Sequence, residues 1–112
     1  MNTLDAETDP RLVETDPDTD SPCVQAIRFE EERMVWEMVD GRVATAPLAH
    51  WPTIWLATKE ERETFQIARC AVHWPLLDAD IASDDILHGC REHRNFARKA
   101  WCRWMDRNYA AA

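Results

Sequence analysis

Three side chains near Pro75 are of the types that most often carry out acid–base chemistry. His73 is followed by Asp78 and Asp80, and a carboxylate pair beside an imidazole could hold a metal ion or relay a proton. The two aspartates follow a proline, however, in a segment expected to turn, where Asp side chains commonly accept hydrogen bonds from nearby backbone amides. We therefore expect structural roles for all three residues and no catalytic site.

Histidine and cysteine lie close together around residue 90, where His88, Cys90 and His93 could converge on one zinc ion. A structural zinc site needs four ligands, and the chain has no Cys-x-x-Cys pair to complete one. In a reducing compartment, widely spaced cysteines are expected to be buried thiols. They are Cys23, Cys70, Cys90 and Cys102. We expect neither a metal nor a cofactor.

Six tryptophans are many for a chain of 112 residues. Because each can bury about 150–250 Å², they are expected to supply much of the core. Trp51, Trp55 and Trp74, together with His50, could instead line a ligand pocket, since aromatic clefts bind rings and cations. We favour the interpretation that these indoles pack a helix onto a sheet.

The chain has the length and composition of one globular domain. Its 112 residues fit a single domain, and 46% hydrophobic residues suffice for a packed core. No apolar run approaches the roughly 20 residues that a membrane helix needs. The acidic N-terminus also lacks the basic and then apolar layout of a signal peptide. We therefore expect a cytoplasmic protein without a membrane partner.

Charge is distributed unevenly along the chain, whose formal net charge is −8. Residues 1–20 carry seven acids and one arginine, which gives −6, and residues 21–90 carry twelve acids and six bases, which also gives −6. Residues 91–112 carry six bases and two acids, which gives +4. The sequence thus predicts an acidic body with an acidic tail and one basic C-terminal segment.

Three short strands are expected in the first ordered part of the chain. The first two lie near residues 24–29 and 34–39, with a charged turn between them. An Asp-Gly pair at residues 40–41 is a strong hairpin signal, because both turn positions need positive φ. A two-residue loop would pair Met38 with Val43. The side chains that this pairing places on the core face are Met34, Trp36, Met38 and Val43.

Helical spacing follows, with apolar residues recurring at three to four positions from Trp51 to Trp55 and a capping box over residues 58–61. Residues 67–74 should form a fourth strand, and Ser83 should cap a short helix. Residues 91–109 contain neither Pro nor Gly and should form a long amphipathic helix with one basic side. Its apolar stripe consists of Phe96, Ala97, Ala100, Trp101, Trp104 and Met105.

The sequence therefore predicts an α+β fold. A small antiparallel sheet, made of a three-stranded meander plus a fourth strand, carries short helices and a longer C-terminal helix. Residues 1–21 are expected to be a disordered acidic tail, because so few apolar groups cannot offset the entropy of ordering. Residues 22–89 are expected to form the α+β domain, and residues 90–112 an amphipathic basic helix that packs on it and closes the core.

Several short motifs follow one another between Cys23 and Gly89. They are Asp40-Gly41-Arg42, Ala46-Pro47-Leu48, Trp51-Pro52, Ala57-Thr58 ahead of Glu60-Glu61-Arg62, His73-Trp74-Pro75-Leu76-Leu77-Asp78-Ala79-Asp80-Ile81, and Ile86-Leu87-His88-Gly89. With these motifs the chain resembles the bacterial family catalogued as domain of unknown function 2442. The acidic tail and the helix after residue 91 lie outside the matched region.

The resemblance implies a small α+β domain without an agreed enzymatic activity. Some members of the family are fused to helix-turn-helix modules, and many are encoded beside another small protein in what look like toxin–antitoxin pairs. It also implies structural roles for the motif residues Asp40, Gly41, His73, Trp74, Pro75, Asp78 and Asp80. A protein partner encoded by a neighbouring gene is therefore expected.

We expect a small non-enzymatic protein-binding module, antitoxin-like or another acidic inhibitor of a basic partner protein. The alternative is a nucleic-acid-binding regulator that acts through the basic C-terminal helix, although the nineteen acids of residues 1–90 repel a polyanion. A homodimer is a further alternative. The candidate partner-binding residues are Arg94, Arg98, Trp101, Arg103, Trp104 and Arg107.

Overall fold

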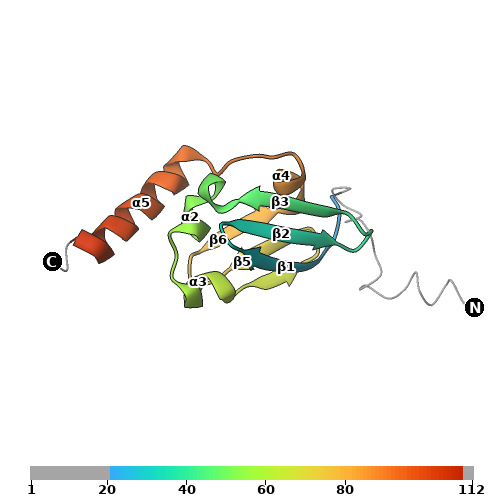
Figure 1. Cartoon of the computed structure of the whole chain (residues 1–112), viewed down its shortest axis with the longest axis horizontal. Helices are drawn as coiled ribbons and strands as arrows, with labels where there is room; N and C mark the ends of the chain where they lie inside the picture. Colours follow the sequence, from blue (N-terminus) through green and yellow to red (C-terminus); the bar gives the residue numbers. More distant parts are fainter. Residues whose placement is uncertain (1–20, 110–112) are drawn as a thin grey trace, which may run out of the picture.

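Two three-stranded antiparallel sheets and a long C-terminal helix make up the part of the chain that the computed structural model describes, residues 21–109 (Figure 1). The first sheet contains β1 (Val24–Glu30), β2 (Arg33–Met38) and β3 (Val43–Pro47), and the second contains β4 (Gln66–Ala68), β5 (Ala71–Trp74) and β6 (Ala79–Ala82), each in that order. The helical elements are η2 (Leu48–His50), α2 (Pro52–Trp55), α3 (Lys59–Glu63), α4 (Ser83–Leu87) and α5 (Arg94–Tyr109). The α+β fold class is confirmed. The predicted disordered tail lies outside the described residues, apart from Ser21.

The core lies between the two sheets, because both contribute their largest buried side chains to it. Trp36 of β2 and Trp74 of β5 are both 0% exposed and belong to one apolar cluster with Ile54 of α2. The sheets also meet at their margins, where the Val24 amide of β1 donates to the carbonyl of Arg69, next to β4, at 2.7 Å. Tryptophan packing thus joins the elements, as the sequence predicted.

The β2–β3 hairpin has a three-residue loop where the sequence predicted two residues. Val43 pairs with Glu37 and not with Met38, whose amide donates instead to the Arg42 carbonyl at 2.8 Å. The predicted core face keeps its three β2 residues, but Val43 is 58% exposed, and buried Ala46 takes the inward position on β3. The correction follows from strand geometry, since a one-residue shift of register turns a side chain to the other face.

Gly41 makes the three-residue loop possible because its φ is +94°. An added Cβ would meet no atom within 4 Å, so Gly41→Ala should destabilise the domain through backbone strain alone, by about 1–2 kcal/mol in urea unfolding. Gly89→Ala is the matched control, because its φ of +69° lies nearer the left-handed helical region and its Cβ is equally unobstructed. An equal or larger loss for Gly89→Ala would contradict this explanation.

The second sheet contains more strands than the sequence predicted. The expected fourth strand over residues 67–74 is a hairpin of β4 and β5, in which Arg69 has φ +52° at the first loop position, as two-residue hairpin loops require. Residues after Pro75, expected to turn, do so only to Asp78, whose φ is +50°. β6 then follows and pairs with β5, so β5 is the central strand of a second meander.

Two predicted helix starts had different outcomes. The capping box that begins α3 is confirmed, because the Thr58 hydroxyl accepts from the Glu61 amide at 3.1 Å and the Glu61 carboxylate accepts from the Thr58 amide at 2.8 Å. Ser83, by contrast, does not cap α4. Ala82 occupies the cap position, and the buried Ser83 hydroxyl donates to the Pro22 carbonyl at 2.7 Å, which ties the start of the described chain to α4.

The predicted long helix is present as α5, but it does not close the core. Only Ala100 is buried within it, and Phe96, Trp101 and Met105 are 58%, 41% and 45% exposed. In Figure 1, α5 extends past the sheets toward the C-terminal end of the chain. The expectation that its apolar stripe covers the core was therefore wrong, because the two sheets and α2 already enclose that core.

Candidate functional site

Helix α5 is held against the body at two points along its length. Before its first turn, the Glu92 carboxylate accepts from the Thr53 amide at 2.9 Å and from the Thr53 hydroxyl at 2.5 Å. Near its end, Arg107 donates to the Leu56 carbonyl at 2.6 Å and lies 3.7 Å from the Glu61 carboxylate. Polar contacts with α2 and α3 therefore anchor the helix near both of its ends.

Removal of the first anchor should loosen α5 measurably. Glu92→Ala leaves the buried Thr53 hydroxyl and amide without this acceptor, which should cost about 1.5–3 kcal/mol in urea unfolding. Hydrogen exchange of the α5 amides should rise in parallel. Glu92→Gln keeps one acceptor oxygen and should lose about half as much. Equal stability of the wild type and Glu92→Ala would show that these bonds do not position the helix.

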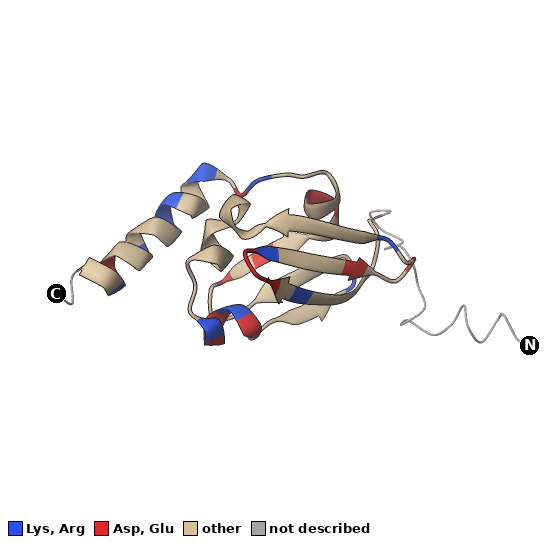
Figure 2. Ribbon diagram, viewed as in Figure 1, with Lys and Arg blue, Asp and Glu red and all other residues tan. Residues whose placement is uncertain are grey.

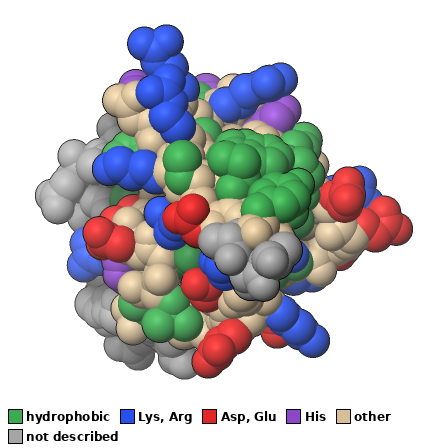
Figure 3. Space-filling view, turned by 90° about the vertical axis from the view of Figure 1, so that its left-hand side faces the viewer, with side chains coloured by type: hydrophobic (Ala, Val, Ile, Leu, Met, Phe, Trp, Pro, Cys, Tyr) green, Lys and Arg blue, Asp and Glu red, His purple; other side chains and the backbone are tan. Residues whose placement is uncertain are grey.

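One side of α5 carries a continuous series of aromatic contacts, which we call the aromatic face. Trp55 of α2 contacts Trp101 with ring centroids 5.8 Å apart, Trp101 contacts Trp104 at 5.9 Å, and Trp104 contacts Tyr109 at 5.6 Å, all edge to face. The aromatic face consists of Trp55, Trp101, Trp104, Met105 and Tyr109. Figure 3, which views the molecule from the α5 end, shows hydrophobic side chains gathered in one patch with basic side chains near it.

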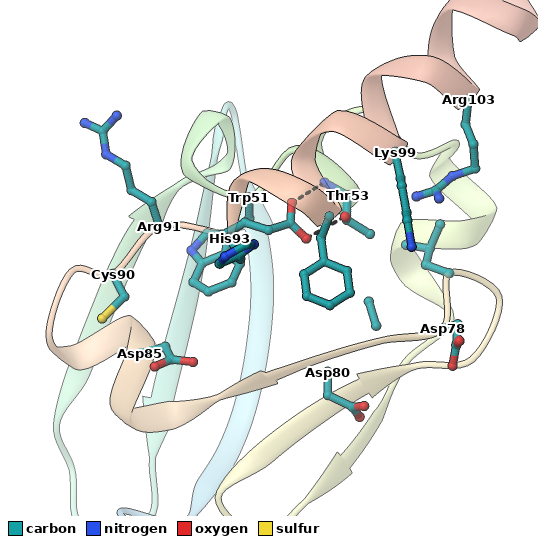
Figure 4. A pocket seen from close by; sticks show the side chains of 14 residues that line it. Trp51, Thr53, Asp78, Asp80, Asp85, Cys90, Arg91, His93, Lys99 and Arg103 are labelled. Carbon is teal, nitrogen blue, oxygen red and sulfur yellow. Dashed lines mark hydrogen bonds between the residues drawn. The ribbon is translucent and has the colours of Figure 1, made fainter.

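The basic residues of α5 divide between two sides of the helix. Arg94 and Arg98 precede Trp101 by seven and three residues, so they lie on the same side of the helix as the aromatic face. Lys99 and Arg103 lie on the side that faces the second sheet (Figure 4). Figure 2 shows these cations along α5, whereas acidic residues concentrate on the body. Arg107, a predicted partner-binding residue, is instead one of the anchors described above.

A groove of about 750 Å³ lies between α5 and β6. Figure 4 shows Asp78, Asp80 and Asp85 along its sheet side and Lys99 and Arg103 on its helix side. The remaining lining mixes the apolar side chains of Trp51, Leu77, Ala79 and Phe96 with polar ones, among them Thr53, Glu92 and His93. No sequence pattern predicted this groove, because its walls come from segments about twenty residues apart that only the placement of α5 brings together.

The three candidate acid–base residues do not converge on one point. His73 and Asp80 are directly opposite on β5 and β6, with Nδ1 and Oδ1 2.7 Å apart. Asp80 borders the groove, whereas His73 is not among the groove residues, and Asp78 occupies the turn before β6. The pair is therefore a cross-strand contact, and its geometry explains both residues as sheet-stabilising neighbours.

The two histidines among the candidate zinc ligands form hydrogen bonds with different partners. His88 Nδ1 lies 2.8 Å from the Asp84 carbonyl, and His93 Nδ1 accepts from the Asn95 amide at the start of α5. Within residues 21–109, no three His, Cys, Asp or Glu side chains are grouped as an ion would require. The expectation of buried thiols holds for Cys23 but is wrong for Cys90 and Cys102, which are exposed. Cys90 lies at one end of the groove (Figure 4).

The tryptophans considered as a ligand pocket are divided among different environments. Trp74 is 0% exposed, and its Nε1 donates to the Arg62 carbonyl at 2.8 Å. Trp51 is buried at the base of the groove, and Trp55 belongs to the aromatic face. The expected packing role is confirmed for Trp51 and Trp74 in the core cluster, and Trp55 packs against that cluster while its ring also contacts Trp101.

The pKa values of two carboxylates on the first sheet are shifted. The hydrogen bond from the Arg42 side chain holds the pKa of Asp40 below its usual value, and the hydrogen bond from Arg28 lowers the pKa of Glu30 in the same way. Both pairs lie in or beside hairpin loops, and none of their residues lines the groove. Their charges therefore stabilise the loops and do not tune the candidate site. This agrees with a structural role for Asp40 and Gly41.

Among the described residues, no helix combines the length and apolar character needed to cross a bilayer.

Comparisons with known proteins identify a family for this chain. Searches of curated proteins and of solved structures gave no match. A family model described as protein of unknown function (DUF2442) matches residues 24–92, more than half of the 112-residue chain, and ends just before α5. The chain therefore belongs to the DUF2442 family of proteins of unknown function.

Proposed function

We propose that this chain is a non-enzymatic protein-binding module that docks on its partner through the aromatic face of α5. The observation that carries the proposal is the exposure of that face, in which Trp101, Met105 and Tyr109 are 41%, 45% and 65% exposed. Single exposed apolar residues are common, but a contiguous patch of them usually marks an interaction surface. Tryptophan, tyrosine, methionine and arginine are also the residues enriched at protein interfaces.

The proposed partner is a basic protein that this chain inhibits, in the manner of an antitoxin or another acidic inhibitor. The formal net charge of −8 supports long-range attraction to a basic surface. The aromatic face would then supply the short-range apolar contact. Because Arg94 and Arg98 lie at its rim, the basic surface of the partner would face the acidic body and not these two arginines. Electrostatics would set the association rate, and the aromatic contacts would set the lifetime of the complex.

The absence of catalysis is part of the proposal, and the candidate acid–base residues support it. His73 and Asp80 satisfy each other across two strands, and Asp78 has a backbone conformation that ends a loop. Substitution of Asp78 by Asn should leave docking of the partner on the aromatic face unchanged, because Asp78 is not part of that face. Loss of a measured enzymatic turnover in that variant, with the fold retained, would refute the non-enzymatic proposal.

Nucleic-acid binding is the second candidate, favoured by the five cations of α5 beside exposed Trp101. The dependence of binding affinity on salt concentration distinguishes the two candidate functions. If five phosphates were neutralised, affinity for a fluorescent oligonucleotide should fall about 10²–10³-fold between 50 and 200 mM salt. Binding of the neighbouring gene's product through an aromatic face should persist at the higher salt. Tight oligonucleotide binding with that steep salt dependence would replace the protein-binding proposal.

A further inference from the structure

Strand β6 is the outer strand of the second sheet and leaves one edge without a strand partner among residues 21–109. Ser83 next to it donates its amide to the Cys70 carbonyl at 2.7 Å. In an antiparallel pair, the residues that exchange hydrogen bonds alternate with those that do not. Ser83 belongs to a hydrogen-bonded pair, so every second residue before it, Ile81 and then Ala79, also exchanges backbone hydrogen bonds with β5. The amides of Asp80 and Ala82 and the carbonyl of Asp80 therefore point away from β5.

This alternation agrees with the side chains. Asp80 and His73 form a non-hydrogen-bonded backbone pair, the type in which opposite side chains come closest, and their side chains are 2.7 Å apart. No backbone hydrogen bond joins Asp80 to any other described element. An edge with unpaired amides and carbonyls is a template for another strand.

The free edge of β6 borders the groove beneath α5. Ala79 and Asp80 belong to both, and Figure 4 shows β6 along one side of the groove with α5 along the other. The volume of about 750 Å³ is large enough for a short extended segment. Because α5 crosses above this edge, a strand added there would be covered on one face by helical side chains.

The helix wall of the groove, with the segment just before α5, is mostly polar, with Phe96 as its apolar side chain and with Arg91, Lys99 and Arg103 as its cations. Phe96 is 58% exposed, and Lys99 lies 5.9 Å from its ring centroid. Lys99 and Arg103 form no ion pair with a described carboxylate, whereas Asp80 on the sheet wall already pairs with His73. Asp85 lies toward the opposite end of the groove (Figure 4). Arg91 lies toward the same end as Asp85, and Asp78 lies on the sheet side across from Lys99 (Figure 4). Lys99 and Arg103 thus give their end of the groove two cations and one carboxylate, so a bound segment should place an acidic side chain beside them.

We propose that the groove between α5 and β6 binds an extended segment of a partner protein, which pairs with the free edge of β6 and places an acidic side chain against Lys99 and Arg103. Main-chain hydrogen bonds supply the affinity in this mode of recognition, and side-chain contacts supply the specificity. The inference deepens the proposed function, because it gives the partner a second contact. It uses different residues from the aromatic face, so each contact can fail without the other.

Capped peptides of alternating valine and threonine test the inference against the full chain. Each has about six residues, a usual strand length, and carries one glutamate at either its first or its last position, since strand direction decides which end meets Lys99. In proton–nitrogen correlation spectra, the peptide that binds more tightly should change the chemical shifts of the Asp80 and Ala82 amides. Its glutamine counterpart should bind about two- to fivefold more weakly, and N-methylation of its edge-facing amides should reduce affinity at least about tenfold.

Matched variants assign these effects to the groove. The double variant Lys99→Gln/Arg103→Gln should abolish the advantage of glutamate over glutamine and retain the effect of N-methylation. Arg98→Gln, on the outward side of α5, should change neither. Trp101→Ala should leave peptide binding intact, so failure of the aromatic-face proposal would be visible separately.

Several results would overturn the inference. Equal binding of the N-methylated peptide would exclude strand pairing, and the absence of groove shifts up to the solubility limit would exclude the site. Tighter binding of a peptide with the sequence of residues 1–20 would assign the groove to the chain's own tail. Changes of the Asp80 and Ala82 amides on dilution would assign it to a second copy of the chain.

Discussion

Trp74→Phe destabilises the domain by about 2–3 kcal/mol, whereas Trp36→Phe costs about 1 kcal/mol or less. Both indoles are 0% exposed, so the two substitutions remove similar apolar area. They differ in hydrogen bonding. Trp74 Nε1 donates to the Arg62 carbonyl at 2.8 Å, while Trp36 Nε1 is buried without a described partner. Phe at position 74 leaves a carbonyl unpaired, and Phe at position 36 removes an unpaired donor.

Urea unfolding followed by far-ultraviolet circular dichroism measures both effects. The alanine variants at the same positions serve as controls, because each should cost about 3–5 kcal/mol through the cavity that it creates. A similar loss for the two alanine variants, together with unequal losses for the two phenylalanine variants, isolates the hydrogen bond. A larger loss of stability for Trp36→Phe than for Trp74→Phe would show that the Trp74 hydrogen bond does not cause the difference.

Trp101→Ala weakens binding to the partner protein at least about thirtyfold, the loss expected when a central tryptophan anchor is removed from an interface. Trp101 contacts Trp55 and Trp104 and occupies the middle of the aromatic face. Because it is 41% exposed, its removal should change the stability of the free chain by about 1 kcal/mol or less. Isothermal titration with the neighbouring gene's product measures the affinity, and urea unfolding measures the stability.

Val43→Ala is the matched control for this experiment. Val43 is a large apolar residue, 58% exposed, and lies on the first sheet outside the aromatic face. Its truncation should leave the affinity unchanged. Full affinity in Trp101→Ala would contradict docking through the aromatic face, and equal losses at positions 43 and 101 would indicate a general effect on the fold.

Local sequence patterns predicted the local structure well. Alternation in β2 correctly placed Met34, Trp36 and Met38 in the core, since a strand places every second side chain on the same face. The capping box correctly began α3, and the absence of Pro and Gly predicted α5. An Asp-Gly pair fits both two-residue and three-residue loops, however, and the sequence does not distinguish them. The predicted pairing of Val43 with Met38 was wrong for that reason.

Relations between distant segments were not predictable from these patterns. β4 and β6 have three and four residues, too few for a periodic signal to separate them from turns. The amphipathic pattern of α5 showed that one side is apolar but not whether the sheets would cover it. The groove likewise depends on the Glu92–Thr53 anchor, which joins residues 39 positions apart. The family match to residues 24–92 leaves α5 outside its range.

Site-specific photo-cross-linking shows whether the partner contacts the aromatic face of α5. A benzoylphenylalanine replaces Trp101 in one variant and Val43 in another, and each is irradiated with the partner in solution. Docking through the aromatic face predicts that position 101 forms a cross-link to the partner and that position 43 forms little or none. Efficient cross-linking from position 43, with none from position 101, would contradict the account.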